Sequence, residues 1–317
     1  MKVGIFLKTT GGSEKLQILK SFAKGVSSFG DYAIMVPERK YVSCDIALIF
    51  GFYSKNRSAL QDFRKTIFET HTSFGKKCVF IDADPLKYAG EIKAERTSSP
   101  NMYFKIPYES IYYDKSKFFN KKCPPDRWNL ICKKKKLNVL PYRKDGDHIL
   151  ICMNRGISKD SKSWATKGVD TIPWLFKIIK KIRRSSNRPI RVRFHPLSTK
   201  EVLSSGVHKQ IIKLDKDISI SGIKRGSTLE GDCEGAWAAV VYNTSASVIP
   251  IINGIPIFTE KKDCLTYDIS NHNIEKFINK PKCFDREQWL NDLAYSLWCE
   301  KELRGGIYWK RLRSFVK

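Results

Sequence analysis

Polar residues follow the apolar runs 148–153, 190–194 and 238–242, which are predicted strands in the second half of the chain. In open parallel sheets, ligands bind beyond the carboxyl ends of the strands. A strand that leads through small hydroxyl residues into a helix offers backbone N–H groups and the positive end of a helix dipole to a phosphate. The sequence therefore predicts a diphosphate site. Its candidate residues are Asn154, Arg155, Gly156, Arg193, His195, Asn243, Thr244, Ser245 and Ser247.

Two of these motifs also have plainer explanations. The Asn243-Thr244-Ser245 segment has the composition of an ordinary helix N-cap. His195 precedes a proline, so it could be a loop histidine with a local hydrogen bond. The presence of His195, Arg193 and the hydroxyl loop after neighbouring strands favours the diphosphate site.

Carboxylates and glycines follow predicted strands of the first half of the chain. Asp82 and Asp84 come directly after the run 77–81, and Asp82 is the preferred candidate for a general base that takes a proton from a hydroxyl. The alternative is structural, because Asp84-Pro85 can begin a turn and Asp82 can cap the next segment. Thr10, Gly11 and Gly12 after the first strand allow close backbone approach to an acceptor molecule. No metal site is predicted, although Asp82 and Asp84 have the Asp-x-Asp spacing.

The elements that position these residues alternate between strands and helices. Such alternation is the signal of βαβ units around parallel sheets, and 317 residues suffice for two domains. The fold class predicted is α/β of the GT-B type, with two Rossmann-like domains that face a cleft and a C-terminal helix that crosses back. The predicted parts are an acceptor-binding domain over 1–140, a nucleotide-sugar domain over 141–285 and the helix over 286–317. Residues 111–144 are interpreted as the interdomain crossing.

The nine cysteines are an odd number without a CxxC motif, and several lie in apolar runs. They are interpreted as reduced thiols, which predicts a cytoplasmic protein. No apolar stretch approaches the length of a membrane span, and the chain begins directly on a predicted strand, so neither a membrane segment nor a signal peptide is expected.

Charge is the unusual feature of the composition. The 58 Lys and Arg exceed the 32 Asp and Glu by 26, which favours a polyanionic partner over a neutral one. Residues 111–144 hold eleven Lys and Arg against two acidic residues and include the run of Lys133, Lys134, Lys135 and Lys136. Aromatic residues are interleaved with these cations and could stack on nucleic-acid bases. They are Tyr112, Tyr113, Phe118, Phe119, Trp128 and Tyr142.

The second half resembles GT-B glycosyltransferases that hold the donor's phosphates with a His-Pro motif and a serine motif, a pairing found in bacterial sialyltransferases and capsule sugar transferases. His195-Pro196 corresponds to the first motif and Asn243–Ser247 to the second. Residues 234–258 (EGAWAAVVYNTSASVIPIINGIPIF) and 286–312 (REQWLNDLAYSLWCEKELRGGIYWKRL) are similar to phage-encoded glycosyltransferase-like proteins. An acidic-acidic-Gly motif of sialyltransferases has no equivalent here. The resemblance thus implies a nucleotide-sugar donor, a UDP-sugar in preference to a CMP- or GDP-sugar, with no tightly bound cofactor.

The resemblance and the charge together predict a phage-type enzyme that transfers a sugar to a hydroxymethylated pyrimidine of double-stranded DNA, as a monomer in the host cytoplasm. Two alternatives stay open. One is a glycosyltransferase of capsule or lipopolysaccharide synthesis, and the other is a nucleic-acid-binding protein without catalysis on a duplicated Rossmann scaffold.

Overall fold

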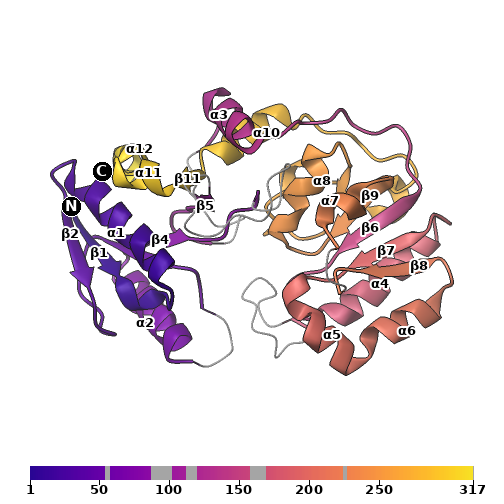
Figure 1. Cartoon of the computed structure of the whole chain (residues 1–317), viewed down its shortest axis with the longest axis horizontal. Coiled ribbons are helices and arrows are strands. Elements are labelled where there is room, and N and C mark those ends of the chain that lie inside the picture. The colour runs from indigo at the N-terminus through magenta and orange to yellow at the C-terminus, as the bar shows by residue number, and fades with distance from the viewer. Residues whose placement is uncertain (54–57, 87–101, 112–119, 158–168, 224–226, 317) are drawn as a thin grey trace. The chain divides into compact units, whose positions relative to one another are not determined.

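The computed structural model describes residues 1–316 except 54–57, 87–101, 112–119, 158–168 and 224–226. The chain divides into two compact units, each with its own parallel sheet (Figure 1). Unit 1 comprises Met1–Tyr53, Arg57–Leu137 and Glu287–Lys317, and unit 2 is built from Asn138–Arg286.

The sheet of unit 1 has the strand order β2-β1-β3-β4. Its strands are β1 (Lys2–Phe6), β2 (Tyr32–Val36), β3 (Ile46–Phe50) and β4 (Lys77–Ile81), and they all run parallel. The interior strand β3 reads IALIF and is buried throughout, as expected for a strand covered on both faces. Helix α1 (Ser13–Ser27) follows the 3-10 turn η1 (Leu7–Thr9), and helix α2 (Ala59–Ser73) follows β3.

The chain's last thirty residues form several short elements rather than the single helix predicted. They are α10 (Glu287–Ala294), β11 (Leu297–Cys299), α11 (Glu300–Arg304) and α12 (Ile307–Val316). Strand β11 pairs antiparallel with β5 (Tyr103–Lys105). Helices α11 and α12 pack on α1 through an apolar cluster that contains Trp309 and Leu303. The segment thus supplies part of the core of unit 1, and its packing across both units stays a prediction.

The predicted crossing over 111–144 also contains regular structure. Helix α3 (Asp126–Lys135) packs on α10 within unit 1. Its anchor is Arg127, whose guanidinium pairs with Glu302 at 2.9 Å and lies 3.7 Å from the ring centroid of Trp298. The helix was missed because its apolar pattern is short and its anchor is a buried arginine that resembles a surface residue in the sequence.

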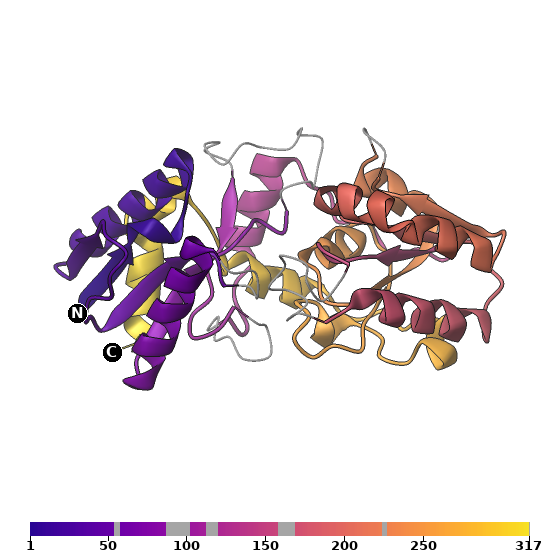
Figure 2. The ribbon, with the colours of Figure 1, turned by 90° about the horizontal axis from the view of Figure 1, so that it is seen from below.

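The sheet of unit 2 is also parallel, with the strand order β10-β9-β6-β7-β8. Its strands are β6 (His148–Cys152), β7 (Ile190–Arg193), β8 (Ile218–Ser221), β9 (Ala236–Val241) and β10 (Ile257–Phe258). Apolar residues of helices α4 (Thr171–Arg183), α5 (Thr199–Ser205) and α6 (Val207–Leu214) pack into one cluster with those of β6, β7 and β8, so the three helices cover the same face of the sheet (Figure 2). Strand β8 and helices α5 and α6 were not predicted, because their apolar residues alternate with many polar ones.

Short elements complete unit 2. They are α7 (Leu229–Cys233), the 3-10 turns η2 (Pro196–Ser198), η3 (Ser245–Ser247) and η4 (Tyr267–Ile269), α8 (Val248–Ile252) and α9 (Ile274–Phe277). The predicted α/β class with two Rossmann-like sheets is confirmed. No helix among the described residues is long and apolar enough to cross a membrane. All nine cysteines are unpaired.

Candidate functional site

The candidate diphosphate residues follow three neighbouring strands of unit 2, β9, β6 and β7. Asn154 after β6 is 1% exposed and joins two of the loops. Its side-chain oxygen accepts from the backbone N–H of Asn243 at 3.3 Å, and its amide nitrogen donates to the backbone carbonyl of Asn243. Because Asn243 begins the hydroxyl loop after β9, Asn154 holds that loop beside the end of β6.

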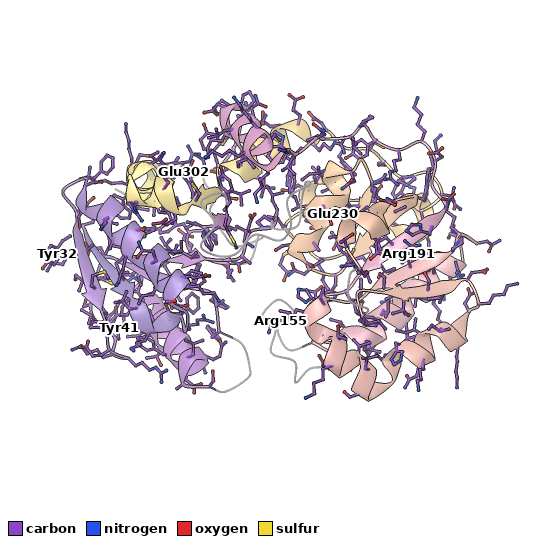
Figure 3. The ribbon with its side chains drawn as sticks, viewed as in Figure 1. Tyr32, Tyr41, Arg155, Arg191, Glu230 and Glu302 are labelled. Atoms are coloured by element: carbon purple, nitrogen blue, oxygen red, sulfur yellow. The ribbon has the colours of Figure 1, made fainter. Side chains whose placement is uncertain are left out.

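A second link joins the loop after β6 to the segment after β7. The backbone N–H of Gly156 donates to the Ser198 hydroxyl at 2.7 Å, and the N–H of Ile157 donates to the Glu201 carboxylate at 3.3 Å. The three candidate loops are therefore connected by hydrogen bonds into one continuous edge. Arg155 is exposed on this edge (Figure 3).

His195 is held in one orientation at this edge. Its Nδ1 accepts a hydrogen bond from the backbone N–H of Leu197 at 3.1 Å, so the ring proton of the neutral form resides on Nε2. Burial, then the charges of Arg155 and Arg193, lower the pKa of His195 to about 4. The imidazole is therefore neutral at pH 7 and offers Nε2–H as a hydrogen-bond donor.

The hydroxyl loop contains both a cap and a spare donor. The Thr244 hydroxyl accepts from the N–H of Ala246 at 3.2 Å, so the plain N-cap explanation holds for this residue. Ser247 is fully buried, and within the described part of the chain its hydroxyl has no hydrogen-bond partner. An unsatisfied buried hydroxyl costs free energy, which makes it a position where a ligand atom would be favourable. Ser245 begins the turn η3 and is half-buried.

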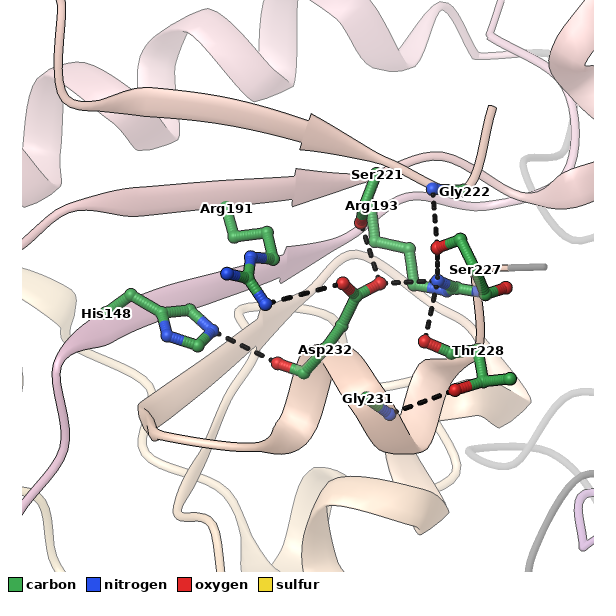
Figure 4. Close-up of polar contacts among 9 residues, drawn as sticks. All are labelled: His148, Arg191, Arg193, Ser221, Gly222, Ser227, Thr228, Gly231 and Asp232. Atoms are coloured by element: carbon green, nitrogen blue, oxygen red, sulfur yellow. Dashed lines mark hydrogen bonds and ion pairs between the residues drawn. The ribbon is translucent and has the colours of Figure 1, made fainter. Parts of the chain in front are cut away.

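The guanidinium of Arg193 is bonded to other residues of the protein. Its guanidinium pairs with Asp232 and donates to the Ser227 hydroxyl at 2.9 Å and to the Thr228 carbonyl at 3.0 Å (Figure 4). The Ser221 hydroxyl also donates to Asp232, at 2.7 Å. The described bonds thus commit Arg193 to fixing the segment before and within α7. Its predicted role at the diphosphate is left as a prediction, and the loop residues 158–168 and 224–226 lie outside the described residues.

The two candidate carboxylates of unit 1 are both buried and paired. Asp82 Oδ2 lies 2.9 Å from Lys105 Nζ, and Asp84 Oδ2 lies 3.1 Å from Lys135 Nζ. Asp84 also accepts the backbone N–H of Leu86 at 2.8 Å, which is the turn that its position before a proline suggested. Burial raises the pKa of Asp84, and the charge of Lys135 opposes that rise. Asp84 is therefore a structural residue, while Asp82 remains the candidate at the end of β4.

The lysine run at the end of α3 divides into two groups. Lys133 and Lys136 are exposed and Lys134 is half-buried, but Lys135 is 2% exposed and paired with Asp84. Lys135 is thus part of the core of unit 1, and this corrects the prediction that it contacts an acceptor. The sequence of four consecutive lysines does not reveal which of them is buried.

The aromatic residues of this region offer little support for base stacking. Trp128 is 6% exposed within unit 1, and Tyr142 lies under the guanidinium of Arg286 at 4.3 Å. Tyr112, Tyr113, Phe118 and Phe119 lie outside the described residues. Thr10, Gly11 and Gly12 lie between β1 and α1, as predicted from their position in the sequence.

Two further charged residues were not among the predicted site residues. Glu230 at the start of α7 has a buried carboxylate oxygen that no described residue pairs with, and burial raises its pKa while the charge of Arg193 opposes this rise. Arg64 on α2 reaches the loop after β1 and donates to the Thr9 carbonyl at 2.9 Å. Neither belongs to a sequence motif, so only the fold reveals them. Among the described residues, no three His, Cys, Asp or Glu side chains group to hold a metal ion.

Two solved structures of Kdo transferases are similar in fold to this chain. The Thermosulfurimonas dismutans KpsC beta Kdo 2,7 transferase has a TM-score of 0.53 at 11% identity and aligns over 98% of this chain and all of its own. The beta Kdo 2,4 transferase of the same KpsC has a TM-score of 0.52 at 11% identity, over 93% of this chain and 89% of its own. The likeness shows that the chain has a GT-B-like fold.

A UDP-GlcNAc 2-epimerase from Methanocaldococcus jannaschii also aligns, over 99% of this chain and all of its own, with a TM-score of 0.35 at 10% identity. No protein-family model matches the chain, and no curated protein matches its sequence.

Proposed function

We propose that the protein is a glycosyltransferase that binds a nucleotide-activated sugar at the carboxyl edge of the unit 2 sheet. The observation that carries this proposal is the continuous edge formed by the loops after β9, β6 and β7, joined through Asn154–Asn243 and Gly156–Ser198. An edge of this kind is where parallel α/β sheets bind nucleotides. We assign cationic Arg155 and the Nε2–H of His195 to the diphosphate, and the buried hydroxyl of Ser247 lies in the same hydroxyl loop.

Asp82 is the proposed general base of the transfer. The acceptor hydroxyl oxygen attacks the anomeric carbon, the bond from that carbon to the donor phosphate breaks, and the nucleotide leaves with the electron pair. The hydroxyl proton passes to the Asp82 carboxylate. The ion pair with Lys105 holds the carboxylate in place at the end of β4. Direct attack of this kind inverts the anomeric configuration.

A glycan is the acceptor class that the observations favour. The two structures with the same architecture are Kdo transferases, and such a likeness of fold raises the weight of glycan transfer only by analogy. The buried positions of Lys135 and Trp128 also remove two of the residues that supported DNA binding. Transfer to a capsule or lipopolysaccharide glycan thus becomes the first candidate. The unpaired cysteines support a reducing cytoplasm as its location.

Double-stranded DNA with hydroxymethylated pyrimidines is the second candidate acceptor. It is favoured by the excess of 26 positive charges and by the exposed Lys133 and Lys136 at the end of α3. A polyanion gains affinity from such cations through counterion release, and this gain falls steeply with salt.

The deciding experiment uses the full chain, first for the donor and then for the acceptor. Calorimetric titration with UDP-, CMP- and GDP-sugars identifies the donor, and UDP-sugar is the expected one. Each bound donor is then incubated with oligosaccharides or hydroxymethylated DNA, and the products are weighed by mass spectrometry. A mass gain on an oligosaccharide supports glycan transfer, and a gain on nucleosides alone replaces it with the DNA acceptor. Binding to DNA without binding of any donor would replace both with a non-catalytic nucleic-acid-binding protein.

A further inference from the structure

Unit 1 has more positive than negative charge at the carboxyl edge of its sheet. Lys105 and Asp82 form an ion pair in which both side chains are nearly buried, 6% and 11% exposed. Arg64 lies close enough for the Asp82 charge to oppose the effect of its burial, which lowers the pKa of Arg64 to about 10. Lys105 is thus the ion-pair partner of Asp82, and half-buried Arg64 adds a second positive charge near the same carboxylate. A bound anion would balance that second charge.

Arg64 has donor capacity to spare. Its Nε and Nη2 donate to the Thr9 carbonyl at 2.9 and 2.7 Å, and its Nη1 donates to the Phe52 carbonyl at 3.1 Å. A guanidinium has five N–H groups, so two are left over, and no described carboxylate lies within ion-pair distance. Gly51, at φ +74°, makes room for it, because a Cβ there would lie 3.1 Å from the guanidinium carbon. The backbone thus fixes Arg64 beside the loop that follows β1.

That loop offers further donors and open space. Thr10 is 9% exposed, and its hydroxyl has no hydrogen-bond partner among the described residues. A Cβ built at Gly11 or Gly12 meets no atom within 4 Å. Gly12 is the N-cap of the 15-residue helix α1 and has no side chain, so it supplies no cap to the N–H groups of Ser13 and Glu14. Glu14 in that turn is exposed to solvent.

From these contacts we infer that Thr10, the N-terminus of α1, Arg64 and Lys105 form a binding site for an anionic group, a phosphate monoester or a carboxylate. On the proposed function, on which this assignment to the acceptor rests, the group belongs to the glycan acceptor. This anionic group balances the positive charge of Arg64. It accepts hydrogen bonds from the remaining N–H groups of Arg64 and from the Thr10 hydroxyl. Binding there would bring the acceptor near Asp82, because Lys105, which we assign to the anion, is the ion-pair partner of Asp82.

A pair of substitutions at Gly12 separates charge from structure. Its φ of −114° and ψ of 141° suit any residue, and both Asp and Asn are strong N-cap residues. Gly12→Asp places a negative charge in the site, whereas Gly12→Asn adds a neutral side chain of the same size. Inorganic phosphate binding to the full chain is measured by calorimetry, with the melting temperature as a check of folding. We expect Gly12→Asp to weaken phosphate binding at least tenfold. Gly12→Asn should weaken it less, because its side chain takes first-turn N–H groups from the anion but adds no negative charge. Unchanged binding in Gly12→Asp, or no binding to the wild type, would overturn the site.

Arg64→Lys supplies an independent readout, because lysine keeps the charge but loses the fork of N–H groups. We expect phosphate affinity to fall about tenfold at an unchanged affinity for the nucleotide-sugar. Turnover is then compared among three oligosaccharides that end in a uronic acid, a phosphate monoester or a neutral sugar. A lower KM for one of the acidic acceptors identifies the anion, and a lower KM for the neutral one contradicts the inference. Should phosphate bind at Gly12 while no donor binds at all, the anion site stands and the proposed function fails.

Discussion

Asn154 and Asn243 are bonded reciprocally, because the side-chain amide of the first both donates to and accepts from the backbone of the second. This pair lies just beyond Cys152 and Val241, the last partners in the β6–β9 ladder. It suits an amide, because Asn and Gln carry a donor atom and an acceptor atom side by side on one planar group. The geometry of the hydroxyl loop thus depends on one buried side chain of the neighbouring strand.

Substitution Asn154→Asp keeps the shape but leaves only acceptors, so the carbonyl of Asn243 loses its partner. We expect the free energy of unfolding to fall by about 1–3 kcal/mol, the cost of an unpaired buried polar group. We also expect nucleotide-sugar affinity to fall about tenfold or more because the hydroxyl loop shifts. Asn279→Asp is the matched control, since Asn279 is exposed and its amide bonds the Ser185 carbonyl. Equal donor affinity in Asn154→Asp and the control would contradict the role of the pair.

Ser247→Ala tests the spare hydroxyl of the donor site. Its removal takes away an unpaired buried polar atom, so the variant should unfold at the same or a higher temperature than the wild type, with a gain of about 1 kcal/mol. Nucleotide-sugar binding should weaken roughly fivefold to tenfold if the hydroxyl bonds a phosphate oxygen. Thermal unfolding and calorimetry measure the two effects. Ser245→Ala, at a half-buried position in the same turn, controls for loss of a hydroxyl as such. Stability that drops while affinity holds would assign Ser247 to packing alone.

The two sheets and the positions of most strands along the chain follow from the sequence, because parallel strands buried on both faces appear as short apolar runs such as IALIF. The loops after those strands could be located for the same reason. The sequence could not predict which side chains in these loops are left free to bind a ligand, because their partners are distant in the sequence. Arg193 turns to Asp232, which lies 39 residues away, and Lys135 turns to Asp84, 51 residues earlier. Arg64 was not predicted as a site residue, because only the fold brings its helix to the loop at Thr9, which lies 55 residues earlier in the sequence.

The buried ion pair of Lys135 with Asp84 predicts a contrast within the lysine run. Lys135→Met leaves the Asp84 carboxylate buried without its cation and should reduce the free energy of unfolding by about 3–5 kcal/mol. The double substitution Lys133→Glu with Lys136→Glu changes only exposed residues and should alter it by less than about 0.5 kcal/mol. Denaturant unfolding at fixed ionic strength compares them. A Lys135→Met protein as stable as the surface double variant would mean that the pair is not formed in solution.

The same surface variant tests the DNA acceptor. Reversal of two exposed charges should weaken DNA binding and reduce the slope of log affinity against log salt if DNA lies on this end of α3. Donor affinity serves as the control and should not change. An unaltered salt slope would remove α3 from any nucleic-acid interface and strengthen the case for a glycan acceptor.

Asp82→Asn tests the general base. Asparagine cannot accept the acceptor's proton, so turnover should fall at least a hundredfold while nucleotide-sugar affinity stays within about twofold. The substitution also leaves Lys105 without its carboxylate, so stability must be measured alongside. The double variant Asp82→Asn with Lys105→Gln removes both charges and separates the two effects. Recovery of turnover in the double variant would show that an unpaired lysine, and not a missing base, caused the loss.

The depressed pKa of His195 predicts the pH dependence of both stability and donor binding. With a folded pKa near 4 against an ordinary value of 6.5, the unfolded chain binds more protons between these values. Stability therefore rises with pH across the window from about 4 to 6.5 and is lost as the pH falls through it. His195→Asn should flatten this part of the profile in thermal unfolding scans.

A bound diphosphate opposes the charges of Arg155 and Arg193, which contribute to the depressed pKa. We therefore expect the nucleotide-sugar to raise the pKa of His195, and by linkage to bind more tightly as the pH is lowered from 7 to 5. The diphosphate of a nucleotide-sugar does not titrate in this range, so the trend reports on the protein. Side-chain NMR of the imidazole with and without donor gives the pKa directly. An unchanged or lowered pKa in the complex would place the diphosphate away from His195 and restrict the donor site to the loops after β6 and β9.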